Sequence, residues 1–359
     1  MVIIGCDFHP GFEQIAMVET TTGEITELRL AHKEEAQQFY AGLRGQEVLV
    51  GVEACGYTQW FEQMLEQMGH RYLIGDAAAI RASYVRRQKT DRRDAGHLLR
   101  LLVEGRFPAL WVPTGADRDV RQLIVHRHKR VEMRTRVKNQ LHALALNQGL
   151  RLRWKLWTRA GMEQLKALQL QPYGTARRAD LLRQLEEMDG EIARLDETVR
   201  KEAEARPAAV RLMSHPGVGP VTALAFVLTI GDVERFKKSR QVASYLGLIP
   251  TERSSGGKQR LGHISKQGNP LLRFLLVEAG HSAVRKDAEL SRCYRRLQHR
   301  HSTGVAKVAV ARKLALRLYW MLRRQTDYAQ LPAVRMQASP CHSVVESKTV
   351  RLSGQPASL

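Results

Sequence analysis

Apolar positions in the first part of the chain follow the patterns of buried strands. Val2 to Cys6 and Val48 to Val52 are short apolar runs, as expected for strands covered on both faces. The turn-prone Thr22-Gly23 separates two segments that are typical of hairpin strands. Three leading strands followed by alternating helix and strand predict a mixed α/β sheet in residues 1–112. The expected strands are 2–6, 13–19, 25–30, 48–52 and 71–74, with a helix at 59–68.

The pattern changes to a helical period after residue 112. From Leu181 to Val199 the spacing of the apolar residues alternates between four and three, which is the heptad pattern of a coiled coil. Residues 120–146 also have a helical pattern and carry many basic side chains. We therefore expect residues 113–207 to form a helical coiled-coil arm, paired within the chain or between chains. The alternative is a solvated helix in a globular bundle.

The last part of the chain is expected to contain a mainly α-helical domain and a tail. Residues 208–330 have a helical pattern, and their longest apolar run, 221–230, suits a buried helix or strand. That run is too short to span a bilayer, which takes about 20 residues. Residues 331–359 lack periodicity and are rich in Ser, Pro, Ala and Gln, so we expect them to be disordered. No basic leader precedes the first strand, which favours a cytoplasmic protein without a membrane partner.

The charge of the chain points to a polyanionic partner. Lys and Arg number 57 against 36 Asp and Glu, a formal net charge of +21. Such an excess favours nucleic acid, because each phosphate contact releases condensed counterions. A basic ribosomal-type or membrane-surface protein is the alternative. The four cysteines form no CxxC pair, which disfavours a zinc knuckle or redox motif and is compatible with a reducing compartment.

Four carboxylates are candidate metal ligands. Asp7 ends the first predicted strand and Glu53 ends the strand at 48–52, while Asp91 and Asp94 open a helical segment. A spacing of three places the last two carboxylates on one helix face. Hard oxygen ligands of this kind suit Mg²⁺ or Mn²⁺, and two such ions can clamp the attacking and leaving oxygens of a phosphodiester. A turn residue or a favourable charge in a first helical turn is the alternative for each residue alone.

Together these segments resemble a known family. Gly5-Cys6-Asp7, Gly51-Val52-Glu53-Ala54 and Lys89-Thr90-Asp91-Arg92-Arg93-Asp94-Ala95 look like the DEDD site of the insertion-sequence one-ten family of transposases. The resemblance implies an N-terminal domain of the RNase H type, similar to Holliday-junction resolvases. It also implies that Asp7, Glu53, Asp91 and Asp94 are catalytic and bind the metal.

Two segments of the C-terminal domain are candidates for nucleic-acid binding. His215 to Ala223 resembles half of a helix–hairpin–helix, in which Gly217 and Gly219 permit a tight turn and the next helix offers free backbone N–H groups to a phosphate. A plain helix–helix turn is the alternative. Farther on, Ser255 precedes two glycines that would admit a bulky backbone. Cations that could stabilise a pentavalent phosphorane and a serine alkoxide flank it: Arg253, Lys258, Arg260 and Lys266.

This serine segment is similar to the C-terminal domain of the same transposase family. The resemblance, which spans about residues 1–325, implies that Ser255 is the nucleophile, although Ser254 precedes it directly and leaves the register open. It further implies a site-specific recombinase that cuts and rejoins donor and target DNA through a phosphoserine link. A bridge RNA and a homo-oligomer, dimer or tetramer, are implied in the same way.

Two other functions remain open at this point. A metal-dependent junction nuclease would hydrolyse DNA at the carboxylates and use Ser255 only structurally. A non-catalytic nucleic-acid scaffold would bind RNA or DNA even after all four carboxylates were replaced. A covalent protein–DNA adduct would distinguish the recombinase from both.

Overall fold

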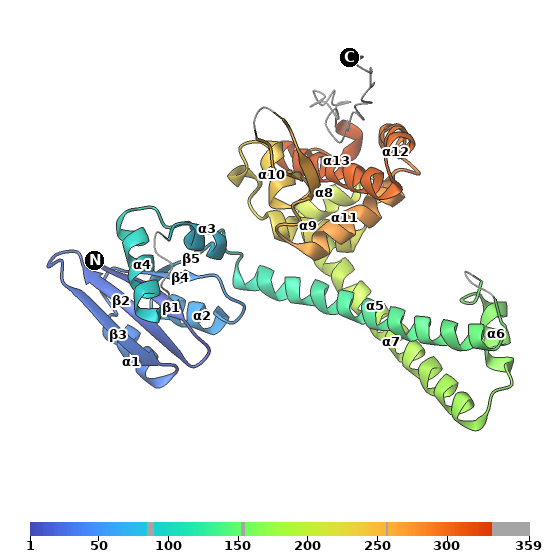
Figure 1. Cartoon of the computed structure of the whole chain (residues 1–359), viewed down its shortest axis with the longest axis horizontal. Coiled ribbons are helices and arrows are strands. Elements are labelled where there is room, and N and C mark those ends of the chain that lie inside the picture. The colour runs from blue at the N-terminus through green and yellow to red at the C-terminus, as the bar shows by residue number, and fades with distance from the viewer. Residues whose placement is uncertain (85–89, 152–154, 256–257, 332–359) are drawn as a thin grey trace, which may run out of the picture. The chain divides into compact units, whose positions relative to one another are not determined.

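The chain folds as two compact units in a computed structural model (Figure 1). The structure describes residues 1–84, 90–151, 155–255 and 258–331. The first unit is Met1–Val112 and the second begins at Pro113. The second unit takes in both the helical arm and the C-terminal helices. Apart from Leu331, the segment expected to be a disordered tail lies outside the described residues.

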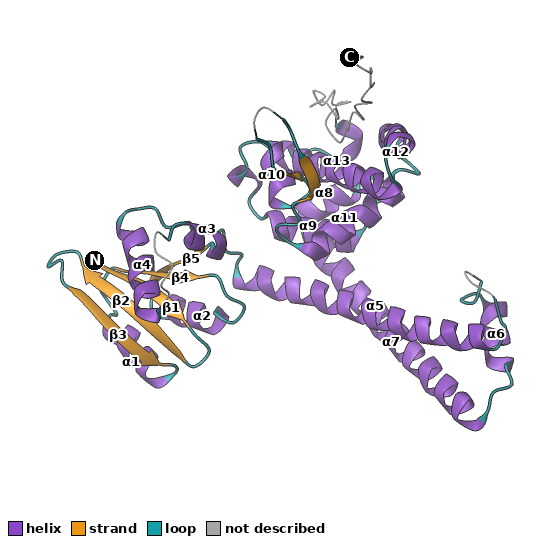
Figure 2. Cartoon of the chain, in the orientation of Figure 1, coloured by secondary structure: helices purple, strands orange, loops and turns teal. Residues whose placement is uncertain are grey.

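A five-stranded mixed sheet forms the centre of the first unit. Its strand order is β3-β2-β1-β4-β5, with β1 antiparallel to β2, β2 antiparallel to β3, and β4 parallel to both β1 and β5. The predicted mixed α/β sheet is therefore confirmed, and Figure 2 shows its strands. The strands are β1 (Val2–Phe8), β2 (Phe12–Glu19), β3 (Ile25–Ala31), β4 (Val48–Glu53) and β5 (Arg71–Gly75).

Helices cover both faces of this sheet. On one face, Tyr40 of α1 (Glu34–Gly42) and Phe61 of α2 (Gln59–Gln67) pack in a core with the even-numbered residues of β1. On the other face, Ala95 and Leu99 of α4 (Asp91–Val103) pack against Ile3. A short helix, α3 (Ala77–Ala82), follows β5. Side chains alternate across a strand, so odd-numbered residues of β1 face α4.

A buried acid lies between the sheet and α1. Glu13 of β2 is 0 % exposed, and its carboxylate accepts a hydrogen bond from the Cys6 thiol at 3.4 Å. Burial raises the pKa of Glu13 to about 7, although the hydrogen bond with Cys6 opposes the shift. A carboxyl group so far from water favours its neutral form. Glu13 is therefore a titrating group in the core of the first unit.

Replacing Glu13 by Gln should remove a pH dependence of stability. The folded pKa of about 7 exceeds the ordinary 4.5, so the folded state binds the extra proton between these values. Stability is then full below pH 4.5 and falls as pH rises to about 7, by about 3 kcal/mol. Urea unfolding at pH 5 and pH 8 should show this loss in the parent and not in Glu13→Gln. The exposed Glu24→Gln serves as control, and an identical loss in Glu13→Gln would contradict the prediction.

Two long helices pair within the chain to form the arm of the second unit. They are α5 (Gly115–Asn147) and α7 (Pro172–Glu204), with α6 (Arg159–Ala167) between them in sequence. Leu181 and Leu185 are buried against Leu141 of α5. Three ion pairs run along the two helices in opposite order, which makes them antiparallel: Arg127–Asp196, Arg130–Glu191 and Arg134–Asp189. Of the two pairings expected from the sequence, the structure shows the one within the chain.

The remainder of the second unit is mostly helical, as predicted. The apolar run at 221–230 forms the buried helix α9 rather than a strand, and Phe226 and Leu224 are 0 % exposed in the largest core. The elements are α8 (Pro207–Met213), α9 (Pro220–Ile230), η1 (Val233–Arg235), α10 (Ser239–Tyr245), β6 (Pro250–Glu252), β7 (Leu261–Ile264), α11 (Pro270–Ala283), α12 (Ala288–Arg300), α13 (Thr303–Arg324) and η2 (Tyr328–Gln330).

The cysteines of the described residues are unpaired. Cys6, Cys55 and Cys293 are free thiols, and Cys341 lies outside the described residues. Within the part of the chain that the structure describes, every helix is too short or too polar to cross a membrane.

Candidate functional site

The two strand-end carboxylates lie on neighbouring parallel strands. The register pairs Cys6 of β1 with Val52 of β4, so Asp7 and Glu53 are the next positions along the two strands. Asp7 points to the face covered by α4, because Gly5 lies two residues earlier on that face. Glu53 is the neighbour of Asp7 in the parallel register and points to the same face. A Cβ at Gly5 would lie 2.3 Å from the backbone nitrogen of Leu99, so α4 approaches the sheet closely here. Glycine at this position lets the helix bring its own carboxylates to the sheet.

The first turn of α4 supplies the other two carboxylates. Thr90 caps the helix by accepting a hydrogen bond from the backbone of Arg93, which fixes where the helix begins. Asp91 is half-exposed, whereas Asp94 is buried with 5 % exposed area. The Tyr84 hydroxyl donates a hydrogen bond of 2.6 Å to Asp94 Oδ1. Tyr84 thus holds the buried carboxylate, a contact that the sequence did not predict.

A histidine that was not predicted joins this group. His9 Nε2 lies 3.2 Å from Asp7 Oδ2 and 3.7 Å from Asp91 Oδ1. Ligand atoms of Asp7, His9 and Asp91 all lie within 4.8 Å of one another, a spacing that could hold a metal ion. The ring of His9 also stacks on Phe12 at 4.6 Å. The only sequence signal for His9 is that it follows Asp7 by two residues, the spacing of side chains on one face of an extended segment.

The geometric group of ligand atoms contains Asp7 and Asp91 with His9, and Asp94 and Glu53 are linked to it through their electrostatic effects on neighbouring groups. Burial raises the pKa of Asp7, His9 opposes this, and the negative charges of Asp94 and Asp91 raise it further. The pKa of Tyr84 is raised by burial, by its hydrogen bond to Asp94, and by the charges of Asp94, Asp7 and Glu53. Crowded carboxylates of this kind repel one another, and a divalent cation would relieve the repulsion. The donor set therefore fits a hard cation with oxygen ligands.

The candidate serine lies in a short β-hairpin of the second unit. Strands β6 and β7 pair antiparallel, and beyond them Ser255 forms an isolated bridge with Lys258. Ser254 Oγ donates a hydrogen bond to Glu252 at 2.6 Å and accepts one from the backbone nitrogen of Arg260 at 3.1 Å. Ser255 is exposed at the end of this hairpin. The two glycines after it lie outside the described residues.

Exposed cationic side chains flank the hairpin. All four predicted cations are exposed, and none of them forms an ion pair within the described residues. His263 on β7 is exposed as well. A serine in this setting has positive charge nearby, and the carboxylate of the same hairpin, Glu252, accepts a hydrogen bond from Ser254. The four cations are Arg253, Lys258, Arg260 and Lys266.

The two glycines in the turn between α8 and α9 have different structural roles. Gly217 has φ +85°, and a Cβ there would lie 2.5 Å from the backbone nitrogen of Ala283 in α11, so close helix packing requires glycine. Gly219 is exposed, has open space around it and precedes the first turn of α9. Of the two positions, Gly219 is therefore the exposed one, directly before Pro220 at the start of α9.

Comparison with known proteins decides the family. The profile of the Transposase IS116/IS110/IS902 family matches residues 209–295, and that of an IS110-type DEDD transposase matches residues 4–148. The chain is 31 % identical over 290 residues to the "Probable family 20 transposase" of Pseudomonas aeruginosa, covering 78 % of this chain and 85 % of that protein. The chain belongs to the IS110 family of DEDD transposases.

Further relatives are also described as transposases. The transposase for insertion sequence element IS1111A of Coxiella burnetii is 29 % identical, covering 78 % of this chain and 79 % of its own. The transposase for element IS1328 of Yersinia enterocolitica is 28 % identical, covering 77 % and 84 % respectively. The resemblance noted from the motifs is thus confirmed. This chain is an insertion-sequence transposase, an enzyme that acts on DNA.

Both groups of candidate residues fall inside the matched segments of this transposase. The carboxylates lie within residues 4–148 and Ser255 lies within residues 209–295. The carboxylates belong to the first compact unit and the serine to the second. The transposase therefore carries two chemically different candidate centres, one acidic and one basic.

Proposed function

We propose that this transposase cuts and rejoins DNA by serine transesterification, assisted by a divalent-metal site. In this proposal residues 1–112 are an RNase H-like DEDD domain, 113–207 a coiled-coil arm, and 208–330 the serine-bearing transposase domain. The mixed sheet with α4 packed on its carboxylate face supports the first assignment, and the antiparallel pairing of α5 with α7 supports the second.

Asp7, Glu53, Asp91 and Asp94 would hold Mg²⁺ or Mn²⁺, with His9 beside them. The bound cation would neutralise phosphate charge and lower the pKa of an oxygen nucleophile. Tyr84 positions Asp94 by donating its hydroxyl hydrogen to Oδ1. His9 orients Asp7 through the 3.2 Å contact. These contacts would limit the motion of the carboxylates before DNA arrives.

Ser255 would supply the nucleophile. Its Oγ forms a bond to a DNA phosphorus, and one phosphorus–oxygen bond of the strand breaks. The deoxyribose oxygen that leaves takes up a proton, while the serine proton passes to a base. The reverse attack by a deoxyribose hydroxyl rejoins the strand and frees the serine, with no net hydrolysis. Arg253, Lys258, Arg260 and Lys266 would stabilise the negative pentavalent phosphorus.

The single observation that supports Ser255 over Ser254 is the hydrogen bonding of the hairpin. Ser254 both donates to Glu252 and accepts from the backbone of Arg260, so its hydroxyl helps to close the turn. Ser255 is exposed at the end of the turn among exposed cations. An accessible hydroxyl can reach a phosphodiester without breaking the hairpin.

The proposed partners follow from charge and family. Donor and target DNA are the substrates of the reaction. A net charge of +21 suits further nucleic acid, and we include a bridge RNA and assembly as a homodimer or tetramer. Sequencing the RNA that co-purifies with the full chain would identify such a guide as one abundant species from the flank of the element.

Trapping a covalent adduct tests the proposal. Full-length protein is incubated with labelled DNA containing the ends of its insertion sequence, the co-purifying RNA and Mn²⁺, and then denatured. We expect a protein–DNA adduct whose phosphopeptide maps to Ser255. Ser255→Ala should give no adduct, and the matched Ser254→Ala should still give one if the hairpin survives. An adduct at Ser254 would reassign the nucleophile.

A metal-dependent junction nuclease is the second candidate. It is favoured by the compactness of the acidic centre, in which the Asp7, His9 and Asp91 ligand atoms lie within 4.8 Å. Cleavage without any adduct, and unchanged in Ser255→Ala, would establish that function. Nucleic-acid binding without cleavage would instead leave a non-catalytic scaffold.

A further inference from the structure

Helix α12 has a basic face that the proposed reaction does not use. Its apolar side, Leu290, Cys293 and Leu297, is buried in two small clusters that include Val310 and Ala306 of α13. The opposite side follows a spacing of three and four residues, which forms one row along a helix. This outer row, hereafter the α12 row, consists of the exposed residues Arg292, Arg295, Arg296 and His299.

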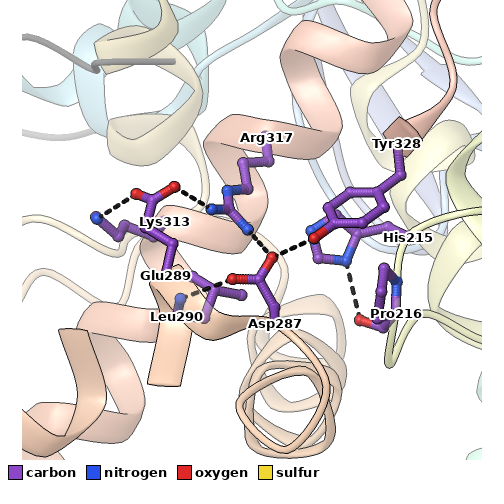
Figure 3. A network of polar contacts seen from close by, with 8 residues as sticks. All are labelled: His215, Pro216, Asp287, Glu289, Leu290, Lys313, Arg317 and Tyr328. Atoms are coloured by element: carbon purple, nitrogen blue, oxygen red, sulfur yellow. Dashed lines mark hydrogen bonds and ion pairs between the residues drawn. The ribbon is translucent and has the colours of Figure 1, made fainter. Parts of the chain in front are cut away.

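The carboxylates nearest to the α12 row are engaged with cations of α13 (Figure 3). Asp287 accepts a 2.6 Å hydrogen bond from Arg317, and Glu289 accepts from Arg317 at 2.6 Å and from Lys313 at 3.0 Å. Asp287 also caps α12 through the backbone nitrogen of Leu290 at 2.7 Å. These acids therefore neutralise charges on α13 and leave the outer row positive.

The same network holds α12 in a fixed position. Tyr328 donates its hydroxyl hydrogen to Asp287 at 2.6 Å, and its ring lies 4.6 Å from that of buried His215 (Figure 3). Arg317 is 12 % exposed and Asp287 3 %. Arg317 donates one N–H group to Asp287 and another to Glu289, and such charge-assisted hydrogen bonds fix the guanidinium between the two carboxylates. The network thus ties the N-terminal turn of α12, from which the row starts, to α13.

We propose that the α12 row binds the sugar–phosphate backbone of duplex DNA. Arginine guanidinium groups in a row match closely spaced phosphates, and the row spans about 10 Å of helix axis. A surface for single strands would need exposed aromatic rings for base stacking. The aromatic residue of α12, Tyr294, is instead half-buried against the core clusters. DNA rather than RNA follows from the family's action on DNA.

This surface is separate from the serine hairpin. In Figure 1, α12 and α10, which leads into the hairpin, lie on different sides of α13. The row would hold flanking duplex in place through phosphate contacts that carry no sequence information. The inference depends on the transposase acting on DNA and is independent of the serine mechanism.

The test compares two triple variants with equal charge change. One is Arg292→Gln/Arg295→Gln/Arg296→Gln. The control is Arg159→Gln/Arg183→Gln/Arg200→Gln, which removes three exposed arginines that pair with carboxylates elsewhere. Fluorescence anisotropy measures binding of the full chain to a short DNA duplex over a range of KCl concentrations. Each lost phosphate contact should flatten the slope of log affinity against log salt by about 0.9, or about 2.7 for all three.

We expect the α12 variant to lose at least about tenfold in affinity at moderate salt, and the control to keep the parental slope. Equal losses in both variants would overturn the proposal in favour of overall charge. A loss confined to single-stranded DNA, or to duplex RNA, would overturn the assignment to duplex DNA. Matching thermal unfolding of both variants and the parent shows that the fold is kept. At saturating protein the α12 variant should still form the Ser255 adduct, which separates this proposal from the serine mechanism.

Discussion

Replacing Asp94 by Asn is expected to abolish strand exchange. Asp94 is 5 % exposed and accepts a hydrogen bond from Tyr84, and the amide oxygen of Asn can keep that contact. The substitution therefore removes one negative charge from the acidic centre with little change in shape. A metal site contributes several kcal/mol to a transition state, and each 1.4 kcal/mol is about tenfold in rate. We expect a loss of about a thousandfold or more.

Two measurements separate this effect from unfolding. Calorimetric titration with Mn²⁺ should show tight binding to the parent and a large loss in Asp94→Asn, while the unfolding temperature without metal stays the same or rises. It can rise because a buried charge is removed from a crowded site. Glu27→Gln, which removes a half-exposed carboxylate of β3 paired with Arg92, is the control and should retain both metal and activity. Full strand exchange by Asp94→Asn would exclude the proposed metal role.

Residues of the acidic centre that depend on tertiary contacts could not be predicted from the sequence. The positions of Asp7 and Glu53 near the ends of neighbouring strands were predictable because each directly follows an apolar run, and the shared helix face of Asp91 and Asp94 was predictable from their spacing. His9 and Tyr84 were missed. His9 meets Asp91, and Tyr84 meets Asp94, only after α4 has packed on the sheet. The pattern of one segment contains no information about such a partner.

The same limit applies to secondary structure. Helix α1 was not predicted, since only Ala36 and Tyr40 of its nine residues are buried and the apolar pattern is correspondingly weak. The hairpin of β6 and β7 was not predicted either. Its strands have three and four residues, and their side chains are half-buried or exposed, so no alternation marks them. The long amphipathic helices and buried strands were predictable because burial imposes a period on many residues.

The proposed reaction also requires the acidic centre and the serine hairpin to act on the same DNA. A serine hydroxyl is a poor nucleophile at neutral pH and needs a base, a metal or strong local cations. The hairpin supplies cations, but its nearby carboxylate, Glu252, accepts from Ser254. The acidic centre belongs to the other compact unit. We propose that the two centres act together on DNA, and that the acidic unit of one protomer serves the serine of another.

Mixing two inactive variants is expected to restore strand exchange. Ser255→Ala lacks the nucleophile and Asp94→Asn lacks the metal site, so each homo-oligomer should be inactive. If composite sites form across chains, a mixed dimer contains one site with both an intact serine and an intact acidic centre. With random mixing in equal amounts, half of the dimers are mixed and each has one intact site of two. About a quarter of the parental activity should then return, by this counting alone.

The comparison needs proof that the subunits mix. Each variant carries a different affinity tag, and sequential purification isolates mixed oligomers before the strand-exchange assay. In these isolated dimers one site of two is intact, so about half of the parental activity is expected rather than about a quarter. The matched control is the double variant Ser255→Ala/Asp94→Asn purified with the parent chain. Across chains, that pairing leaves no site with both intact groups, whereas sites within one chain would leave the parental protomer fully competent. Activity in the first mixture with none in the control supports sites shared between chains, and the reverse pattern places each complete site within a single chain.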